Sequence, residues 1–139
     1  MTKSYLVIAT PRSGSTLLGQ GLQASGVAGE PREFFGHKMA HWMERWKTPE
    51  LPAYVAQLQA RRSSGNGVFG AKLLYAQLLH LEAMAQQDSE LAALSRGDLL
   101  RALFPDLHIL WATRDDKLRQ AISWFKARQT GVGGEVLCY

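Results

Sequence analysis

Cysteine is nearly absent from this chain, which has 139 residues and a single cysteine, Cys138. One cysteine excludes an internal disulfide framework and a zinc site built from several cysteines, and it suits a reducing cytoplasm. Long hydrophobic runs are also missing: the first apolar stretch covers only residues 5–9, shorter than a secretory signal, and no stretch approaches the ~20 apolar residues of a membrane span. We therefore expect a cytoplasmic protein without a membrane span.

Charge of one sign is not concentrated in the sequence either. Sixteen Lys and Arg residues against 12 Asp and Glu residues give a net charge of +4. This excess attracts anions mildly but contains no dense basic run, so no nucleic-acid partner is expected. A hydrophobic content of 46% and a charged content of 20% exclude a disordered chain, a collagen and a coiled coil. We expect residues 1–139 to form a single domain.

Short apolar runs alternate with helical patterns along the chain. The runs at 5–9, 68–72 and 107–113 have the length and composition of buried parallel strands. Helices are predicted from residue 15, from a Thr48 cap with Pro49 in the first position, after residue 72, up to Pro105, and over 117–129 with Leu118, Ala121, Ile122 and Phe125 on one face. This alternation predicts an α/β fold, a parallel sheet flanked by helices.

The segment between the first predicted strand and helix, residues 10–17, has the composition of an anion-binding loop. Its sequence is Thr-Pro-Arg-Ser-Gly-Ser-Thr-Leu. The glycine lets the backbone approach a ligand, and the N–H groups of residues 13–16 and the helix dipole converge there. Hydroxyls and the Arg12 guanidinium can donate hydrogen bonds to phosphate or sulfate oxygens. The alternative is an ordinary capped helix after a turn, but the position at the carboxyl end of a strand favours binding.

This loop is not the phosphate loop of ATP-binding proteins. That motif requires a glycine where this chain has Ala9 and a lysine where it has Ser15. Without the lysine, Mg-ATP chemistry is disfavoured, and a small kinase is an unfavourable interpretation.

A second candidate group follows the third predicted strand. Arg114 comes directly after that strand, and Ser123 lies nine residues further on, in the next helix. A charged strand end and a small buried serine would explain both residues equally well. Together with the first loop, however, they suggest a ligand with two separated anionic groups.

The third group is the segment Gly-Glu-Pro-Arg-Glu-Phe-Phe at residues 29–35. A carboxylate desolvated by Phe34 and Phe35 would have a raised pKa and could serve as a general base. Solvated surface acids are the alternative. Lys72, at the end of the second predicted strand, either reaches the anion or is exposed. No metal site is predicted, because no third ligand accompanies His37 and His41, which are four residues apart.

These groups, in this order, resemble a PAPS-dependent sulfotransferase (PAPS is 3′-phosphoadenosine 5′-phosphosulfate), and in particular the bacterial trehalose 2-sulfotransferase (Stf0-like) type. Four stretches carry the resemblance: residues 5–18, 26–35, 67–72 and 114–125. The Gly-Glu-Pro-x-Glu-Phe-Phe stretch is the most specific of them. The resemblance implies the P-loop-like nucleotide fold of sulfotransferases. Since family members are longer, this chain would be the N-terminal part, without the family's C-terminal portion.

The resemblance also implies roles for individual residues. Arg114 and Ser123 would bind the 3′-phosphate, Glu33 would take the proton of the acceptor hydroxyl, and Glu30 would touch the sugar. The 5′-phosphosulfate would be bound by Pro11, Arg12, Ser13, Gly14, Ser15, Thr16 and Leu17, with Arg12 as the main electrostatic group.

The activity implied is in-line transfer of a sulfuryl group from PAPS to a carbohydrate or glycolipid hydroxyl, without a metal and with PAP as product. A non-catalytic remnant, which binds PAP or another nucleotide or takes part in protein interactions, is the alternative. A homo-oligomer is a further expectation.

Overall fold

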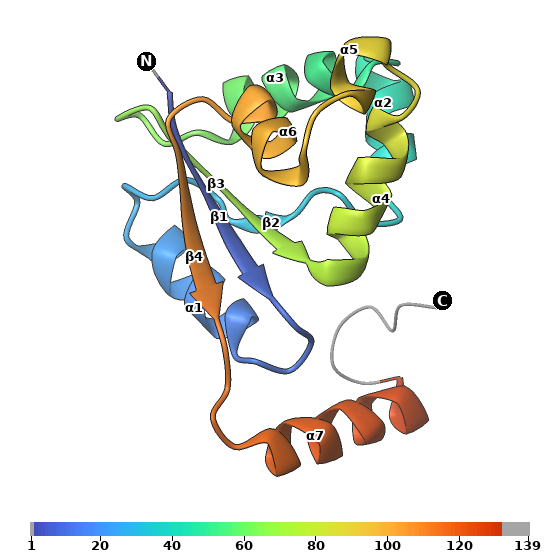
Figure 1. The fold of residues 1–139 in the computed structure, drawn as a ribbon. Helices are drawn as coiled ribbons and strands as arrows, with labels where there is room; N and C mark the ends of the chain where they lie inside the picture. The colour runs from blue at the N-terminus through green and yellow to red at the C-terminus, as the bar shows by residue number, and fades with distance from the viewer. Residues whose placement is uncertain (1, 132–139) are drawn as a thin grey trace.

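A four-stranded sheet with all strands parallel forms the centre of the molecule, in the order β2-β3-β1-β4 (Figure 1). The structure, a computed structural model, describes residues 2–131; Cys138 lies outside them. The strands are β1 (Lys3–Ala9), β2 (Arg32–Glu33), β3 (Val68–Leu74) and β4 (Leu107–Ala112). The predicted α/β architecture, a parallel sheet flanked by helices, is confirmed, and β2 is a short strand that the sequence pattern did not reveal.

The helices lie on both faces of this sheet. Figure 1 shows α1 on one face, with α3, α4 and α6 on the other, while α7 extends away from the end of β4. Their bounds are α1 (Ser15–Ala24), α2 (Met39–Trp46), α3 (Leu51–Arg62), α4 (Tyr75–Ala85), α5 (Ser89–Ala92), α6 (Arg96–Leu103) and α7 (Lys117–Thr130). The predicted starts of α1 and α7 are confirmed.

The predicted start of the third helix is wrong. The helix begins at Leu51, after an extended Glu50, and Pro52 occupies its first turn. A start at Pro49 would have put Pro52 one full turn inside the helix, where its missing N–H and its ring would disrupt the first intrahelical hydrogen bond. The later of the two prolines therefore sets the helix start.

Aromatic residues dominate the core between the sheet and the helices α2, α3, α4 and α6. Phe35 and Phe104 are fully buried, and their rings pack edge to face with centroids 5.8 Å apart. Tyr54 of α3 is also fully buried and donates its hydroxyl hydrogen to the Phe34 carbonyl, at 2.8 Å. Burial raises the pKa of Tyr54 to about 12, because the core disfavours the ionised phenol.

The opposite face of the sheet requires a glycine in β3. A Cβ at Gly70 would collide with the ring of Tyr5 on the neighbouring strand. Tyr5 donates a 2.7 Å hydrogen bond to the Ala28 carbonyl, and burial raises its pKa to about 12 as well. Gly70 therefore lets an aromatic ring lie flat against the sheet and tie it to the segment after α1.

The two strands that pair with β1 differ in their surroundings. β3 is buried along almost its whole length, whereas none of the residues of β4 is buried. Trp111 at the end of β4 is 79% exposed. Among residues 2–131, no helix is long and apolar enough to cross a membrane, and no cluster of three or more His, Cys, Asp or Glu side chains could hold a metal ion.

Candidate active site

The loop between β1 and α1 lies at the carboxyl end of the strand that pairs with both β3 and β4. Arg12 and Gly14 both have positive φ angles, 63° and 90°, and no atom lies within 4 Å of the point where a Cβ of Gly14 would sit. Two left-handed residues turn the chain sharply, so α1 begins at Ser15, directly after the strand end. The N–H groups of its first turn lack helical partners, and the helix dipole there attracts anions.

A buried hydroxyl in this loop fits an anionic ligand. Ser13 Oγ is buried and has no hydrogen-bond partner among the described residues. An unsatisfied buried hydroxyl costs roughly 1–3 kcal/mol, and a ligand oxygen at this loop would remove that cost. Ser15 is buried as well, whereas the Leu17 side chain is 75% exposed. The serines and the backbone of the predicted loop therefore suit a phosphate or sulfate group.

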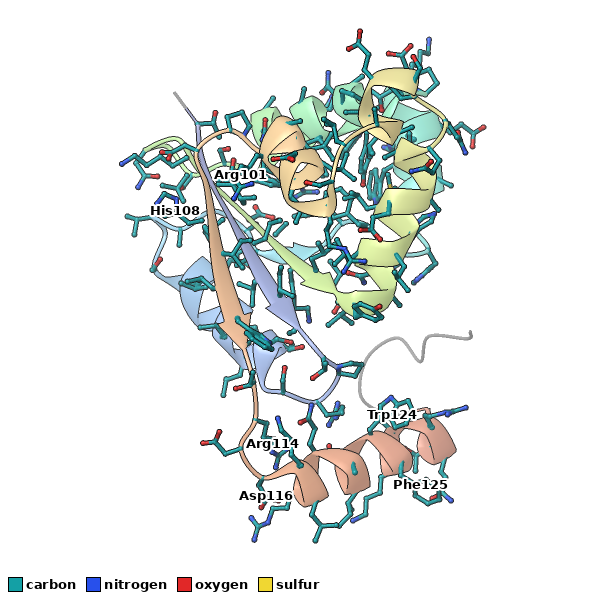
Figure 2. All side chains as sticks on the ribbon, viewed as in Figure 1. Arg101, His108, Arg114, Asp116, Trp124 and Phe125 are labelled. Carbon is teal, nitrogen blue, oxygen red and sulfur yellow. The ribbon has the colours of Figure 1, made fainter. Side chains whose placement is uncertain are left out.

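The first two predicted groups meet in space. Arg12 Nε donates a 2.8 Å hydrogen bond to Ser123 Oγ of α7, and Arg114 Nη1 donates to the Arg12 carbonyl at 3.4 Å. Because a hydroxyl oxygen can accept one hydrogen bond and still donate its own, Ser123 keeps a donor for a ligand. In Figure 2, Arg114 lies in the connection between β4 and α7, close to the β1–α1 loop. Two cationic side chains and a hydroxyl are thus gathered beside the loop.

A cavity of about 300 Å³ lies between this loop and α7. Its lining residues are Thr10, Pro11, Lys117, Gln120, Ala121 and Trp124. Gln120 Nε2 joins the two sides, because it donates to Thr10 Oγ1 and to the Pro11 carbonyl, both at 2.9 Å. An aromatic ring and an ammonium group beside an anion-binding loop suit a flat, polar ring system attached to an anion.

The sequence had pointed to a different face of α7. The four α7 residues that line the cavity recur at the i, i+3, i+4, i+7 spacing of one helix face, and this signal in the sequence could have identified them. All four residues predicted to share an apolar face are exposed instead: Ala121, Leu118 (72%), Ile122 (45%) and Phe125 (61%). Figure 2 shows Trp124 on the side of α7 toward the loop and Phe125 on the outer side.

Glu33 lies at the end of β2, opposite Lys72 of β3 in the strand register. Lys72 Nζ is 2.6 Å from Glu33 Oε1 and also donates to Thr16 Oγ1 of the anion loop, at 3.0 Å. Gln77 Nε2 donates to the other oxygen, Oε2, at 2.8 Å. The side chain of Glu33 remains 23% exposed. The structure thus brings the predicted base and the predicted anion loop together through one lysine.

The surroundings predicted for this carboxylate are wrong. Phe35 points into the core, and the hydrogen-bonding partners of Glu33 are an ammonium group and an amide. The alternative in which Lys72 is exposed is also wrong, since only 10% of its side chain is accessible. Gln77, fully buried in α4, was missed altogether. Its sequence neighbourhood resembles any Leu-rich helix start, so no local signal identifies it.

Glu30 belongs to a different ion-pair group. Arg62 Nη1 lies 2.9 Å from Glu30 Oε2, and Arg32 Nε lies 4.0 Å from the same oxygen. The side chain of Glu30 is 35% exposed. The two carboxylates of the segment 29–35 therefore face different cations, and only Glu33 is connected to the anion loop through Lys72.

Comparison with known proteins gives concordant matches. The sequence model of the Stf0 sulphotransferase family matches residues 4–134. A trehalose 2-sulfotransferase of Mycobacterium tuberculosis (strain ATCC 35801 / TMC 107 / Erdman) is 36% identical over an alignment of 160 residues, and this alignment covers 94% of this chain. A trehalose 2-sulfotransferase of Mycolicibacterium smegmatis (strain ATCC 700084 / mc(2)155) is 33% identical over an alignment of 158 residues, and this alignment covers 93% of this chain. Each alignment covers 58% of the relative's own length.

Proposed function

Because the chain belongs to the Stf0 sulfotransferase family, we propose that it takes part in the transfer of a sulfuryl group from PAPS to a hydroxyl group of a carbohydrate. One observation carries this proposal: Lys72 contacts both Glu33 and Thr16. A carboxylate suited to accept a proton therefore lies one side chain away from a loop suited to bind an anion. In-line transfer requires this arrangement, since the acceptor must approach the sulfur opposite the leaving oxygen.

The residues beside the loop fit the donor in both of its anionic parts. Ser13, the N–H groups at the start of α1 and Arg12 would hold the 5′-phosphosulfate. Arg114 and the Ser123 hydroxyl would hold the 3′-phosphate, and the cavity beside Trp124 would accept the base. When bound, the donor supplies the sulfuryl group and a stable phosphate leaving group.

The residues of the chain would then act on charge and on one proton. Arg12 and the helix N-terminus would stabilise the negative charge that develops on the leaving oxygen. Glu33 would orient the acceptor hydroxyl and accept its proton at a carboxylate oxygen as the new S–O bond forms. Glu30, with its two arginine partners, would contact other hydroxyls of the sugar. The names of the relatives make trehalose the first acceptor to test.

A second candidate function is binding of PAP or another nucleotide without catalysis. The exposed apolar residues of β4 and α7 favour it, because the part of the site on this side rests on few packed contacts.

Calorimetry with PAP, AMP and ATP, followed by a transfer assay with radiolabelled PAPS and trehalose, tests the proposal. We expect PAP to bind more tightly than AMP or ATP, and label to appear in the sugar. Preferential binding of ATP would refute the donor assignment. PAP binding without transfer to trehalose or to other sugars would favour the second candidate.

A further inference from the structure

Gln77 is a polar side chain in an apolar place. It is only 2% exposed and is the third residue of α4, a helix whose other buried residues are Leu78, Leu81 and Ala85. Burial of an amide is costly unless both of its ends are hydrogen-bonded. The contacts of Gln77 therefore explain why it is tolerated.

Both ends of the amide are hydrogen-bonded. Oε1 accepts from the backbone N–H of Leu74 at 3.2 Å, and Nε2 donates to Glu33 Oε2 at 2.8 Å. A backbone N–H can only donate, so the amide oxygen must face Leu74 and the NH₂ group must face Glu33. The side chain of the third helical residue thus accepts a hydrogen bond from the backbone of the residue before the helix, and this contact is half of a capping box. The start of α4 thus fixes the direction in which the amide donates.

The second oxygen of Glu33 is held from β3. Lys72 lies opposite Glu33 in the strand register, and its Nζ is 2.6 Å from Oε1. Each carboxylate oxygen therefore has its own partner, one from the end of β3 and one from the start of α4. Rotation of the carboxylate about its last bond would break both contacts.

We propose that Gln77 is a positioning residue for Glu33: together with Lys72 it fixes the plane of the carboxylate that accepts the acceptor's proton. This inference rests on the proposed function, since the orientation matters for turnover only if Glu33 acts as the base. Misplacement of a catalytic group by about 1 Å costs on the order of 100-fold in rate. The expected loss on removal of one of the two partners is therefore about 10- to 100-fold in kcat.

The kinetic test compares two substitutions at Gln77 with one matched control. Gln77→Met keeps the length of the side chain but removes the donor. Gln77→Glu keeps an acceptor for the Leu74 N–H but replaces the donor to Glu33 by a carboxyl oxygen, so helix capping is kept while the contact that holds Glu33 is disturbed. We expect both variants to lower kcat, with the KM for the donor and the affinity for PAP unchanged. The control is Gln59→Met, which removes a 3.5 Å hydrogen bond from Gln59 of α3 to Ser4 of β1. It should leave kcat unchanged.

A spectroscopic test does not depend on turnover. The side-chain NH₂ signal of Gln77 is the one absent from the NMR spectrum of Gln77→Met. It should shift in Glu33→Gln, where its acceptor loses its charge, and remain in place in Glu30→Gln, which alters the neighbouring ion-pair group. An unmoved signal in Glu33→Gln, or equal shifts in both variants, would overturn the contact.

The outcomes separate the two proposals. If the chain transfers sulfuryl groups and both Gln77 variants keep the wild-type kcat, the positioning role is wrong and the function stands. If the wild-type chain transfers nothing, the proposed activity and the effect of Gln77 on turnover are both wrong. The NMR signal then decides only whether the amide holds the carboxylate.

Discussion

β3 and β4 both pair with β1 in parallel, yet they lie in opposite environments. Six of the seven residues of β3 are buried, and none of the six residues of β4 is. Both strands are rich in apolar residues, so composition does not decide which is covered. The elements packed against them do: β3 lies under the helices of the aromatic core, and β4 leads to a helix that extends away from the sheet (Figure 1).

The candidate site is divided along the same line. We call residues 32–104 with β1 the packed half, and residues 107–130 the open half. Glu33, Lys72 and Gln77 belong to the packed half, whereas Arg114 and Ser123 belong to the open half. The geometry around the base is therefore set by the core, and the geometry around the 3′-phosphate group is set mainly by a few polar contacts to the β1–α1 loop.

The largest expected effect concerns the base in the packed half. Glu33→Gln should lower the rate of sulfuryl transfer by about 10²- to 10⁴-fold, the usual contribution of a general base. The affinity for PAP, measured by calorimetry, should not change, because the donor contacts lie elsewhere. Glu30→Gln is the matched control, and it should raise the acceptor KM with a smaller effect on kcat. A wild-type rate for Glu33→Gln would remove Glu33 from the mechanism.

Substitutions in the two halves should also differ in their effect on the free energy of unfolding. Phe104→Ala removes a fully buried ring and should lower the free energy of unfolding by about 3–5 kcal/mol. Trp111→Ala removes a larger side chain that is 79% exposed, and it should change that free energy by no more than about 0.5 kcal/mol. Urea denaturation measures both values. Equal losses would mean that the open half is as well packed as the other.

A substitution in the open half should change how well the protein distinguishes PAP from AMP. Arg114→Ala should weaken binding of PAP by about 1.5–3 kcal/mol and hardly affect AMP, because only PAP carries a 3′-phosphate. Arg119→Ala removes an arginine of α7 that pairs with Asp116, and it should affect binding of neither nucleotide. If Arg114→Ala weakens both nucleotides equally, the 3′-phosphate site lies elsewhere.

The exposed edge of the sheet should favour self-association. An uncovered apolar edge strand is a template for pairing with another chain. Sedimentation velocity should show association that grows with concentration, and Trp111→Lys should reduce it. Lys117→Ala, a change on the cavity side of α7, should not. A monomer at all concentrations would show that β4 is protected in solution.

The packed half should also lose stability in alkaline solution. Tyr5 and Tyr54 have pKa values raised to about 12 by burial, from 10. The fold thus favours the neutral phenols, so their contribution is complete below pH 10 and is lost as the pH rises toward 12. Urea denaturation across this range should show the loss, and Tyr5→Phe should reduce its slope. An unchanged slope would contradict the assignment.

The parts of the site that follow from local sequence were predictable. A short apolar run followed by glycine, hydroxyls and an arginine identified β1, the anion loop and α1, because each signal lies within a few residues. The partners of Glu33 were not predictable, since Gln77 lies 44 residues away in the chain and reaches it only through the path of β3 and α4. Periodicity in α7 showed which residues share a face, but the face toward the cavity depends on what the fold places beside it.

The distribution of the core has a consequence for synthesis. Among residues 2–131, all members of the buried cluster lie between Leu6 and Phe104, so the ribosome releases them before β4 and α7. Synthesis proceeds from the N-terminus, so the segments of this interior are available to pack while β1 still presents one unpaired edge. β4 then adds to a preformed template, and Arg114 and Ser123 join the site after Glu33, Lys72 and Gln77.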